Sequence, residues 1–195
     1  MIAMSQLYSF DGKAPRIHPG ACVHPSACII GDVHIGDGCF VGPHATLRGD
    51  HGSIRLEPRS NVQDNCVLHC CPGGTVVLHS LAQVGHGAEL HGCTLLENSL
   101  VGIHATILDH AVVGANTIVA AQALVAQGKR LEDGALYAGS PARFVRSMSL
   151  TAIAALREAA EHYVDIARGC ATRLVPVDRG ACAPLPLARV ALGSD

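Results

Sequence analysis

The stretch "VGIHATILDHAVVGANTIVAAQALVAQGKRL", residues 101–131, carries an aliphatic side chain at every sixth position. The same spacing runs through residues 17–47, and in both stretches a small or compact side chain follows four residues after most of the aliphatic ones. The aliphatic positions are Ile17, Val23, Ile29, Ile35, Val41 and Leu47, then Val101, Ile107, Val113, Val119, Val125 and Leu131. A repeat of fixed period is the first thing to explain, because a repeat specifies the whole architecture.

A period of six fits neither a helix of 3.6 residues per turn nor a hairpin meander. It fits a solenoid with three short strands in each coil of 18 residues, where the aliphatic side chain points inward and the small one lets the chain turn. The pattern resembles the hexapeptide repeat of left-handed parallel β-helices, and this resemblance alone supplies the left hand. We therefore expect an all-β solenoid of about six coils.

The register is disturbed between residues 47 and 101. Placing the aliphatic side chains on three faces in turn requires three extra residues in "RGDHGSI" (48–54), four in "HCCPGG" (69–74) and one residue fewer just before Val101. In this threading the inward positions are Leu56, Val62, Leu68, Leu78, Val84, Leu90 and Leu96. Leu68 and Leu90 then lie on the same face in consecutive coils.

A histidine directly follows each of these two leucines. His69 and His91 are 22 residues apart, which is one coil plus the four-residue insertion, so their imidazoles should stack at the strand spacing of about 4.8 Å. This is close enough for both to bind one zinc ion, whose bonds to histidine nitrogen are about 2.0–2.1 Å long. Arg48 should lie one coil further down in the same column.

His86 falls on a different face and cannot reach this pair within one chain. Similarity to trimeric hexapeptide-repeat proteins implies that one face of a chain meets a different face of its neighbour. Two histidines from one subunit and one from the next would then form a three-histidine site with an open fourth position. Most other histidines are expected to be solvated: His18, His24, His34, His44, His104 and His110.

The composition argues against several classes of partner. The 195 residues carry a net charge of −2, with 15% charged residues and no basic run, so we expect neither nucleic acid nor an anionic membrane as a partner. With no export signal and no apolar stretch of membrane-spanning length, the expected location is the cytoplasm. Nine cysteines without a CxxC spacing make a disulfide framework unexpected. Cys70 and Cys71 flank a candidate ligand, so a metal or reactive role stays open for them.

Four short motifs in order, "RGD" (48–50), "NVQD" (61–64), "GH" (85–86) and "LHG" (90–92), resemble the γ-class carbonic anhydrase-like family. The match extends to "KRLEDGALYAGSPARFVRSMS" (129–149), and within the family the chain is similar to the branch of phenylacetate-degradation and carnitine-operon proteins. The resemblance implies a homotrimer whose interfaces bind a divalent ion, zinc or alternatively Fe²⁺ or Co²⁺. Its implied metal ligands are His69, His86 and His91.

The resemblance also assigns roles to residues around the metal. It implies that Gln63 and Asn61 orient the water or the substrate, and that Tyr163 lies near the ion. An ion network around the site would consist of Arg48, Asp50 and Asp64. High-turnover family members carry glutamates just after "RGD" and in the loop after the first metal-binding histidine, where this chain has His51 and the acid-free "CCPGGTVVLHS" (70–80). His51 or His79 could carry protons there instead.

The resemblance therefore implies a small-molecule substrate. Zinc hydroxide can attack CO₂ or another carbonyl carbon, and the branch resemblance favours a CoA thioester. Two other functions stay open, since fold alone does not fix function. One is a metal-independent hexapeptide acyltransferase, as "AGSPAR" (138–143) suggests, and the other is a noncatalytic trimeric scaffold.

After residue 148 helical spacing replaces the period of six. The apolar face would consist of Ile153, Leu156, Ala160, Tyr163 and Ala167. Ser149 or Thr151 is a suitable N-cap and Gly169 a suitable end. We predict three parts: the β-helix with its lead-in and capping coil (1–148), a helix packed along it (149–170), and a proline-containing tail (171–195).

Overall fold

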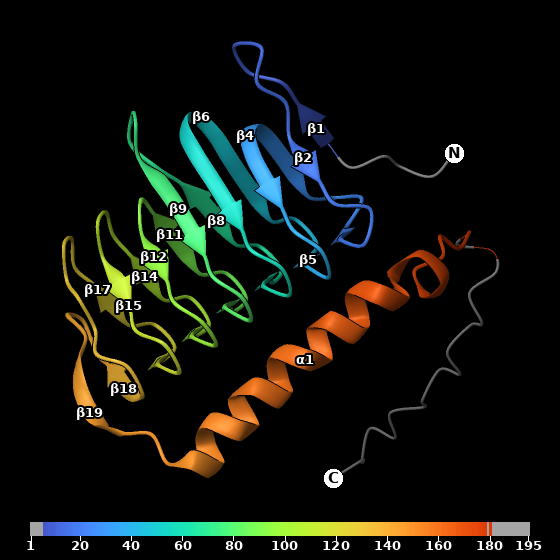
Figure 1. Cartoon of the computed structure of the whole chain (residues 1–195). Coiled ribbons are helices and arrows are strands. Elements are labelled where there is room, and N and C mark those ends of the chain that lie inside the picture. Colours follow the sequence, from blue (N-terminus) through green and yellow to red (C-terminus); the bar gives the residue numbers. More distant parts are fainter. Residues whose placement is uncertain (1–5, 179, 181–195) are drawn as a thin grey trace, which may run out of the picture.

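A computed structural model describes residues 6–178 and residue 180 of the chain. These residues form a β-solenoid with one long helix, α1 (Leu150–Arg173), lying along it (Figure 1). Most of the predicted tail lies outside the described residues. Within the described residues no helix is long and apolar enough to cross a membrane.

Strands stack from coil to coil in two sheets, and all the pairs are parallel except that of the last two strands of the chain, which is antiparallel. One sheet holds β3 (Cys22–Val23), β5 (Phe40–Val41), β7 (Asn61–Val62), β10 (Gln83–Val84), β13 (Leu100–Val101), β16 (Ile118–Val119), β18 (Ala135–Ala138) and β19 (Arg143–Ser147). The other holds β1 (Gln6–Tyr8), β2 (Arg16–Ile17), β4 (Cys28–Ile35), β6 (Thr46–Leu56), β8 (Val67–His69), β9 (Thr75–Leu78), β11 (Glu89–His91), β12 (Thr94–Leu95), β14 (Thr106–Ile107), β15 (Val112–Val113) and β17 (Leu124–Val125). In the second sheet the long strands β4 and β6 join two faces of the prism around one corner.

The period of six is the period of the core. Leu47, Leu68, Leu90 and Ile107 are paired in register from coil to coil and are at most 1% exposed. Each such aliphatic side chain contributes roughly 1.5–3 kcal/mol when fully buried, so stacked columns of them stabilise the prism. Tyr137, in the last coil, is a buried aromatic residue of this core. The predicted solenoid is confirmed. It has seven coils rather than about six, because β18 adds a coil by pairing in parallel with β16.

The two insertions lie where the sequence places them, but the missing residue does not. Leu56 pairs with Leu78, as expected, and Leu78 then pairs with Leu95. Leu95 is fully buried, so the expectation that Leu96 points inward is wrong. The coil is shortened at the corner after Leu90, where Gly92 adopts a positive φ of 54°, and the interval of six resumes from Leu95 to Val101.

Several of the scattered histidines have a structural explanation at the corners of the coils. His44, His104 and His110 have positive φ values between 55° and 59° and are exposed, as predicted for solvated positions. Histidine tolerates this left-handed backbone conformation better than β-branched residues do. His34 is partly buried and lies 3.2 Å from a carboxylate oxygen of Asp32, so it is not simply solvated.

The helix returns along the prism and covers the sheet of β3, β5 and β7. Ser149 is its N-cap, since its side chain accepts a hydrogen bond from the backbone N–H of Ala152 at 3.1 Å. Ala160 and Val164 pack against Leu81, and Gln83 donates a hydrogen bond to the backbone carbonyl of Leu156 at 3.1 Å.

The predicted helix end at Gly169 is wrong, because the helix continues to Arg173. Glycine inside a helix costs about 1 kcal/mol relative to alanine. Cys170 lies beyond it and forms a disulfide with Cys22, with a sulfur–sulfur distance of 2.06 Å. The expectation of no disulfide is therefore corrected for this pair. The sequence separation of 148 residues hides the contact, which arises only because the helix runs back to the first coils.

Candidate metal site

His69 and His91 form the centre of the candidate site. They end β8 and β11 and are direct register partners, as the threading predicts. His69 Nδ1 lies 3.2 Å from His91 Nε2. Two nitrogens bound tetrahedrally to one zinc ion at 2.0–2.1 Å are about 3.3 Å apart, so the pair already has the spacing of two zinc ligands.

A carboxylate holds the outer nitrogen of each ring. His69 Nε2 lies 3.0 Å from Asp50 Oδ1, and His91 Nδ1 lies 2.8 Å from Asp109 Oδ1. If each carboxylate accepts the N–H of its ring, the two lone-pair nitrogens face each other. Such a pair needs a proton or a metal ion between its members. This arrangement, a carboxylate behind each imidazole, is typical of histidines that bind metal.

Charge at the site favours ionised Asp50 and neutral His69. Burial raises the pKa of Asp50, but hydrogen bonds from Arg48, from the His69 ring and from the backbone of His51 outweigh it and lower the pKa to about 2. Arg48 donates to Asp50 at 2.6 Å. Burial lowers the pKa of His69, against the hydrogen bond to Asp50, which raises it. A neutral imidazole with a free lone pair is the form that a divalent ion requires.

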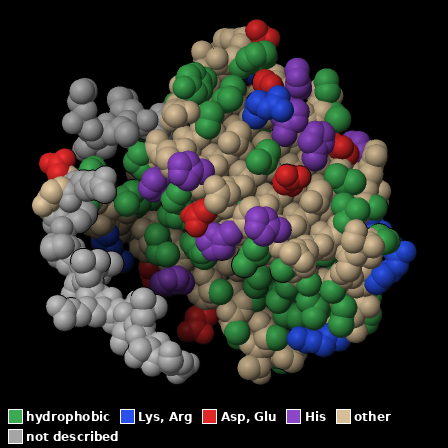
Figure 2. All heavy atoms as spheres, turned by 180° about the vertical axis from the view of Figure 1, so that it is seen from behind, with side chains coloured by type: hydrophobic (Ala, Val, Ile, Leu, Met, Phe, Trp, Pro, Cys, Tyr) green, Lys and Arg blue, Asp and Glu red, His purple; other side chains and the backbone are tan. Residues whose placement is uncertain are grey.

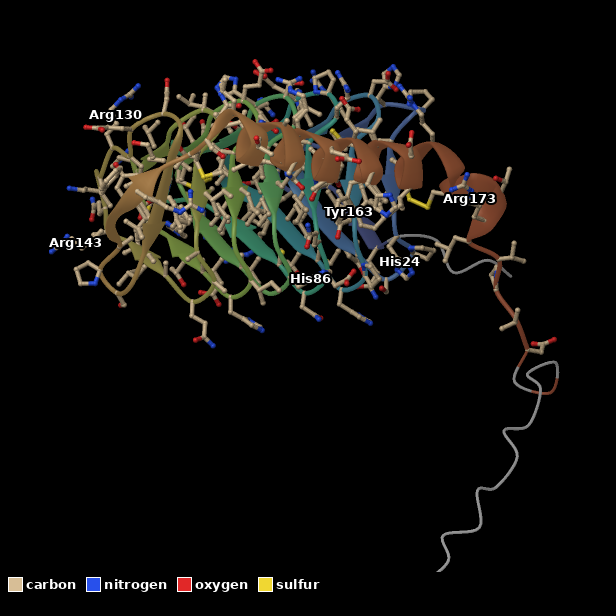
Figure 3. The ribbon with its side chains drawn as sticks, turned by 90° about the horizontal axis from the view of Figure 1, so that it is seen from below. His24, His86, Arg130, Arg143, Tyr163 and Arg173 are labelled. Atoms are coloured by element: carbon tan, nitrogen blue, oxygen red, sulfur yellow. A yellow bond between two sulfur atoms is a disulfide. The ribbon has the colours of Figure 1, made fainter. Side chains whose placement is uncertain are left out.

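His86 belongs to a second group of residues on another face. It follows β10, and its Nδ1 lies 2.9 Å from Asp64 Oδ2. Its side chain is 45% exposed, and Figure 3 shows it pointing away from the prism. The ring of Tyr163 contacts Phe40 with a centroid distance of 5.5 Å. Burial, and then the nearby charge of Asp64, raise the pKa of Tyr163.

Asn61 and Gln63 lie with this second group, one coil before His86 in the same stack of strands. Both are buried, and Gln63 Nε2 donates a hydrogen bond to Asn61 Oδ1 at 3.2 Å. Asn61 Nδ2 is buried without a hydrogen-bond partner. A buried donor left unpaired costs about 1–3 kcal/mol of stability, so the presence of this amide calls for an explanation other than stability.

The predicted site residues therefore divide into two half-sites on different faces of one chain. The first half-site consists of Arg48, Asp50, His51, His69 and His91, and the second of Asn61, Gln63, Asp64, His86 and Tyr163. Figure 2 shows histidine side chains beside acidic ones over one face of the molecule. The predicted network of Arg48, Asp50 and Asp64 is split as well, since Arg48 and Asp50 pair with each other while Asp64 pairs with His86.

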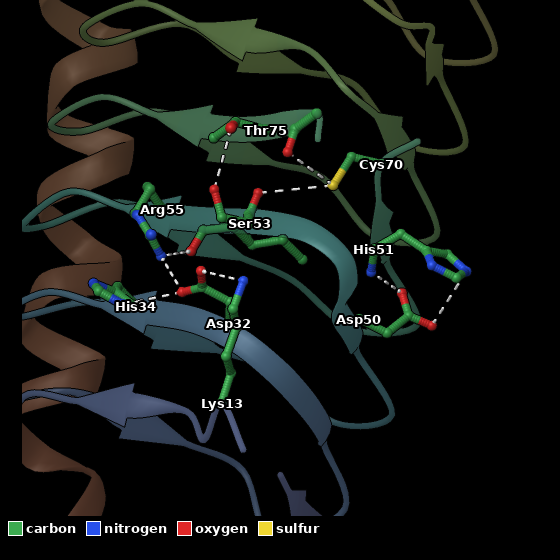
Figure 4. A network of polar contacts seen from close by, with 11 residues as sticks. Lys13, Asp32, His34, Asp50, His51, Ser53, Arg55, Cys70 and Thr75 are labelled. Atoms are coloured by element: carbon green, nitrogen blue, oxygen red, sulfur yellow. Dashed lines mark hydrogen bonds and ion pairs between the residues drawn. The ribbon is translucent and has the colours of Figure 1, made fainter. Parts of the chain in front are cut away.

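The two candidate proton carriers have different surroundings. His51 lies against His69, with ring centroids 5.8 Å apart, and its backbone N–H donates to Asp50 (Figure 4). His79 follows β9 on the third face and pairs with Glu57 at 3.0 Å. The structure therefore brings His51, but not His79, into contact with the first half-site.

One residue near the site, Asp109, was missed from the sequence, and the structure separates the roles of Cys70 and Cys71, which the sequence left open. Asp109 lies 18 residues, one coil, after His91, and this spacing could have revealed it. Ligand atoms of Cys71, His91 and Asp109 lie within 4.8 Å of one another. Cys70 is different, because its buried thiol donates to backbone carbonyls of Gly74 at 3.4 Å and Ser53 at 3.9 Å (Figure 4). Cys70 is therefore structural, whereas exposed Cys71 adjoins the site.

Comparisons with known proteins agree with the fold. Residues 14–49 match the family model "Bacterial transferase hexapeptide (six repeats)". The carnitine operon protein CaiE of Salmonella agona (strain SL483) is 42% identical over 167 residues, which cover 86% of this chain and 84% of that protein. CaiE of Escherichia coli (strain K12) is 43% identical over 164 residues, covering 84% and 83%.

A crystal structure shows the same architecture. The hexapeptide transferase family protein from Anaplasma phagocytophilum is 36% identical, with a TM-score of 0.81 over 87% of this chain and 99% of that one. A sequence identity of 36% over most of both chains means that the similarity is not limited to the positions of the six-residue repeat.

Proposed function

The chain belongs to the hexapeptide-repeat transferase family that includes the CaiE proteins, and we propose that it is a zinc-dependent hydrolase of CoA thioesters within this family. Hydration of CO₂ at the same site is a second reaction to test. The proposal follows the resemblance of its motifs to γ-class carbonic anhydrase-like proteins.

One observation carries the proposal: two imidazole nitrogens face each other at 3.2 Å, each ring held from behind by a carboxylate. Imidazole nitrogens suit zinc, iron and cobalt, and their spacing is close to that of two ligands of one ion. The residues present therefore fit a divalent ion. His69 and His91 would hold it from one chain.

The second half-site supports a shared site between subunits. His86 lies on another face, with its exposed ring held by Asp64, and this position would suit a ligand offered to a neighbouring chain. A threefold arrangement would bring the second half-site of one subunit against the first half-site of the next and would close three identical sites. We therefore propose a homotrimer with three histidines around each ion.

The protein side chains would each have a separate task. A bound divalent ion supplies Lewis acidity and lowers the pKa of water to near 7. Gln63 would orient the substrate carbonyl or the attacking water, and the unpaired amide of Asn61 offers a further donor. Tyr163 would border the substrate beside Asp64. His51, exposed beside His69, would exchange protons with solvent.

Metal analysis combined with activity tests the proposal. We expect about one zinc per chain in purified protein and metal-dependent thioester hydrolysis, both lost in His91→Ala. His18→Ala is the matched control, because His18 also lies 3.1 Å from a carboxylate, that of Asp37, but outside both half-sites. Full hydrolytic activity in metal-free protein would contradict the proposal.

A metal-independent acyltransferase is the second candidate. It is favoured by the description of the family as transferases and by the Asp50–His69 pair, which could act as a general base. Transfer from an acyl-CoA to an added amine or alcohol, unaffected by chelator and lost in Asp50→Asn, would favour this function over hydrolysis.

A further inference from the structure

A groove of about 400 Å³ lies between the prism and the last two turns of α1. Its lining includes His24, Phe40, Pro43, Asp64, Ile166 and Arg173. The volume is within the range of about 300–1,000 Å³ that is typical of small-molecule sites. Apart from the imidazole of His24 and the carboxylate of Asp64, its walls near the prism are mainly apolar.

The groove leads to the second half-site. His24, Pro43 and Asp64 follow β3, β5 and β7, which are consecutive strands of one stack, and His86 follows β10, the next strand. Figure 3 shows His86, Tyr163 and His24 in this order along the prism, with Arg173 near the end of the helix. The groove therefore runs over two strand spacings, about 10 Å, and ends one side chain from His86.

Asp64 connects the groove to the proposed metal ligand. It lines the groove and also lies 2.9 Å from His86 Nδ1. A thioester carbonyl that reacts beside the ion would place its acyl chain next to this carboxylate. Phe40 and Ile166 then offer apolar surface, and the aliphatic stem of Arg173 can cover such a chain while its guanidinium remains in water.

We propose that this groove binds the acyl group of the substrate, an apolar chain of medium length, and thereby sets substrate specificity. This inference rests on the proposed thioesterase function, in which the thioester carbonyl of an acyl-CoA reacts beside the ion that His86 would help to hold. The lining is mainly apolar, with His24, Asp64 and Arg173 as its polar side chains, and this favours an acyl chain over the two amides of a pantetheine arm as occupant.

Affinity as a function of chain length tests the proposal. The probes are non-hydrolysable alkyl-CoA thioethers with ethyl, butyl, hexyl and octyl chains, titrated calorimetrically into the full-length, metal-loaded protein. Full burial of two methylene groups would raise affinity roughly fifteenfold. Because the groove is open along one side, we expect roughly fivefold for each added pair until the groove is filled.

A substitution that fills the groove checks its location. Ile166→Trp should abolish the dependence on chain length and leave the affinity for CoA itself within twofold. Ala155→Trp adds the same side chain to the exposed surface of the same helix and should preserve the dependence. Chain-length dependence that survives in Ile166→Trp would place the acyl group elsewhere and overturn the proposal.

The same experiment separates this inference from the proposed function. Equal affinity for all chain lengths in a protein that hydrolyses thioesters with metal would overturn only the acyl groove. In that case the groove would hold the pantetheine arm, another segment of the protein, or nothing. Affinity that rises with chain length without metal-dependent hydrolysis would sustain the groove and overturn only the thioesterase.

Discussion

At the scale of single residues, the site depends on how two imidazoles are oriented. His69 and His91 are adjacent because the repeat stacks them, but stacking alone does not choose which nitrogens face each other. Asp50 and Asp109 make that choice by holding the outer nitrogen of each ring. The carboxylates therefore prepare the pair for a cation, and their removal should weaken metal binding without unfolding the chain.

Asp109→Asn tests this role. We expect its zinc affinity to fall by roughly 10–100-fold, as is typical for loss of a carboxylate behind a metal-binding histidine. Competition with a chromogenic chelator measures the change. Asp37→Asn is the control, because it alters a similar carboxylate–histidine pair outside the site and should leave the affinity unchanged. Unaltered affinity in Asp109→Asn would mean that His91 needs no such support.

Asp50 also makes stability depend on pH. Its pKa falls from the ordinary 3.8 to about 2 in the folded chain, so its stabilising contribution is complete above about pH 5 and is lost as the pH falls through about 2. Partial exposure of Arg48 reduces the contribution to about 1 kcal/mol. Urea unfolding of metal-free protein across this range should show a smaller loss in Asp50→Asn than in the unaltered chain. Equal losses of stability in the two proteins would contradict the assignment of this pH dependence to Asp50.

The stacking of His69 on His91 could be predicted from the sequence, because their separation of 22 residues equals one coil of 18 plus the visible insertion of four. The sequence did not predict which atoms the rings present. Asp109 was missed although one coil separates it from His91, because Asp is also an ordinary corner residue of such coils. The Cys22–Cys170 bond could not be foreseen at all, since it depends on the direction in which the helix returns.

At the scale of elements, glycines make the tight corners of the coils possible. A Cβ atom built at Gly102 would lie 2.5 Å from the backbone nitrogen of Ala121 in the next coil. At Gly128 the backbone is left-handed, with φ of 68°, but nothing lies within 4 Å of the added atom. One position thus tests contact between coils, and the other tests only local backbone strain.

Gly102→Ala should therefore destabilise the protein more than Gly128→Ala. We expect about 3 kcal/mol or more for the first, because two backbones would have to separate. The second should cost about 1–2 kcal/mol, the penalty of a left-handed backbone for a residue with a Cβ atom. Thermal melting at one protein concentration measures both. A reversed order would contradict the coil spacing described here.

Element boundaries were predictable where the repeat is regular and failed where it is interrupted. The sequence could not show whether Leu95 or Leu96 points inward, since both are leucines. The corner at Gly92 decides which of them does. The helix continues past Gly169 to Arg173, and Cys170, whose disulfide partner Cys22 is distant in sequence, lies in this last turn. Local propensity identified the helix correctly at its start, where Ser149 provides a local signal.

At the scale of the whole molecule, the fold was predictable and the assembly remains a proposal. A single chain holds both half-sites, but the prism keeps them on different faces. Threefold closure would turn two incomplete halves into complete sites. The separation of His86 from His69 and His91 is thus the feature on which the account of function depends.

Mixing two inactive variants tests that central claim most directly. His91→Ala spoils the first half-site and His86→Ala the second, so trimers of either variant alone should lack zinc and activity. In a mixed trimer one interface in three joins two intact halves. After dissociation and reassembly together, the mixture should therefore regain zinc at about one ion per mixed trimer, together with hydrolysis. Full zinc content in His86→Ala alone, or no recovery in verified mixed trimers, would contradict a site shared between subunits.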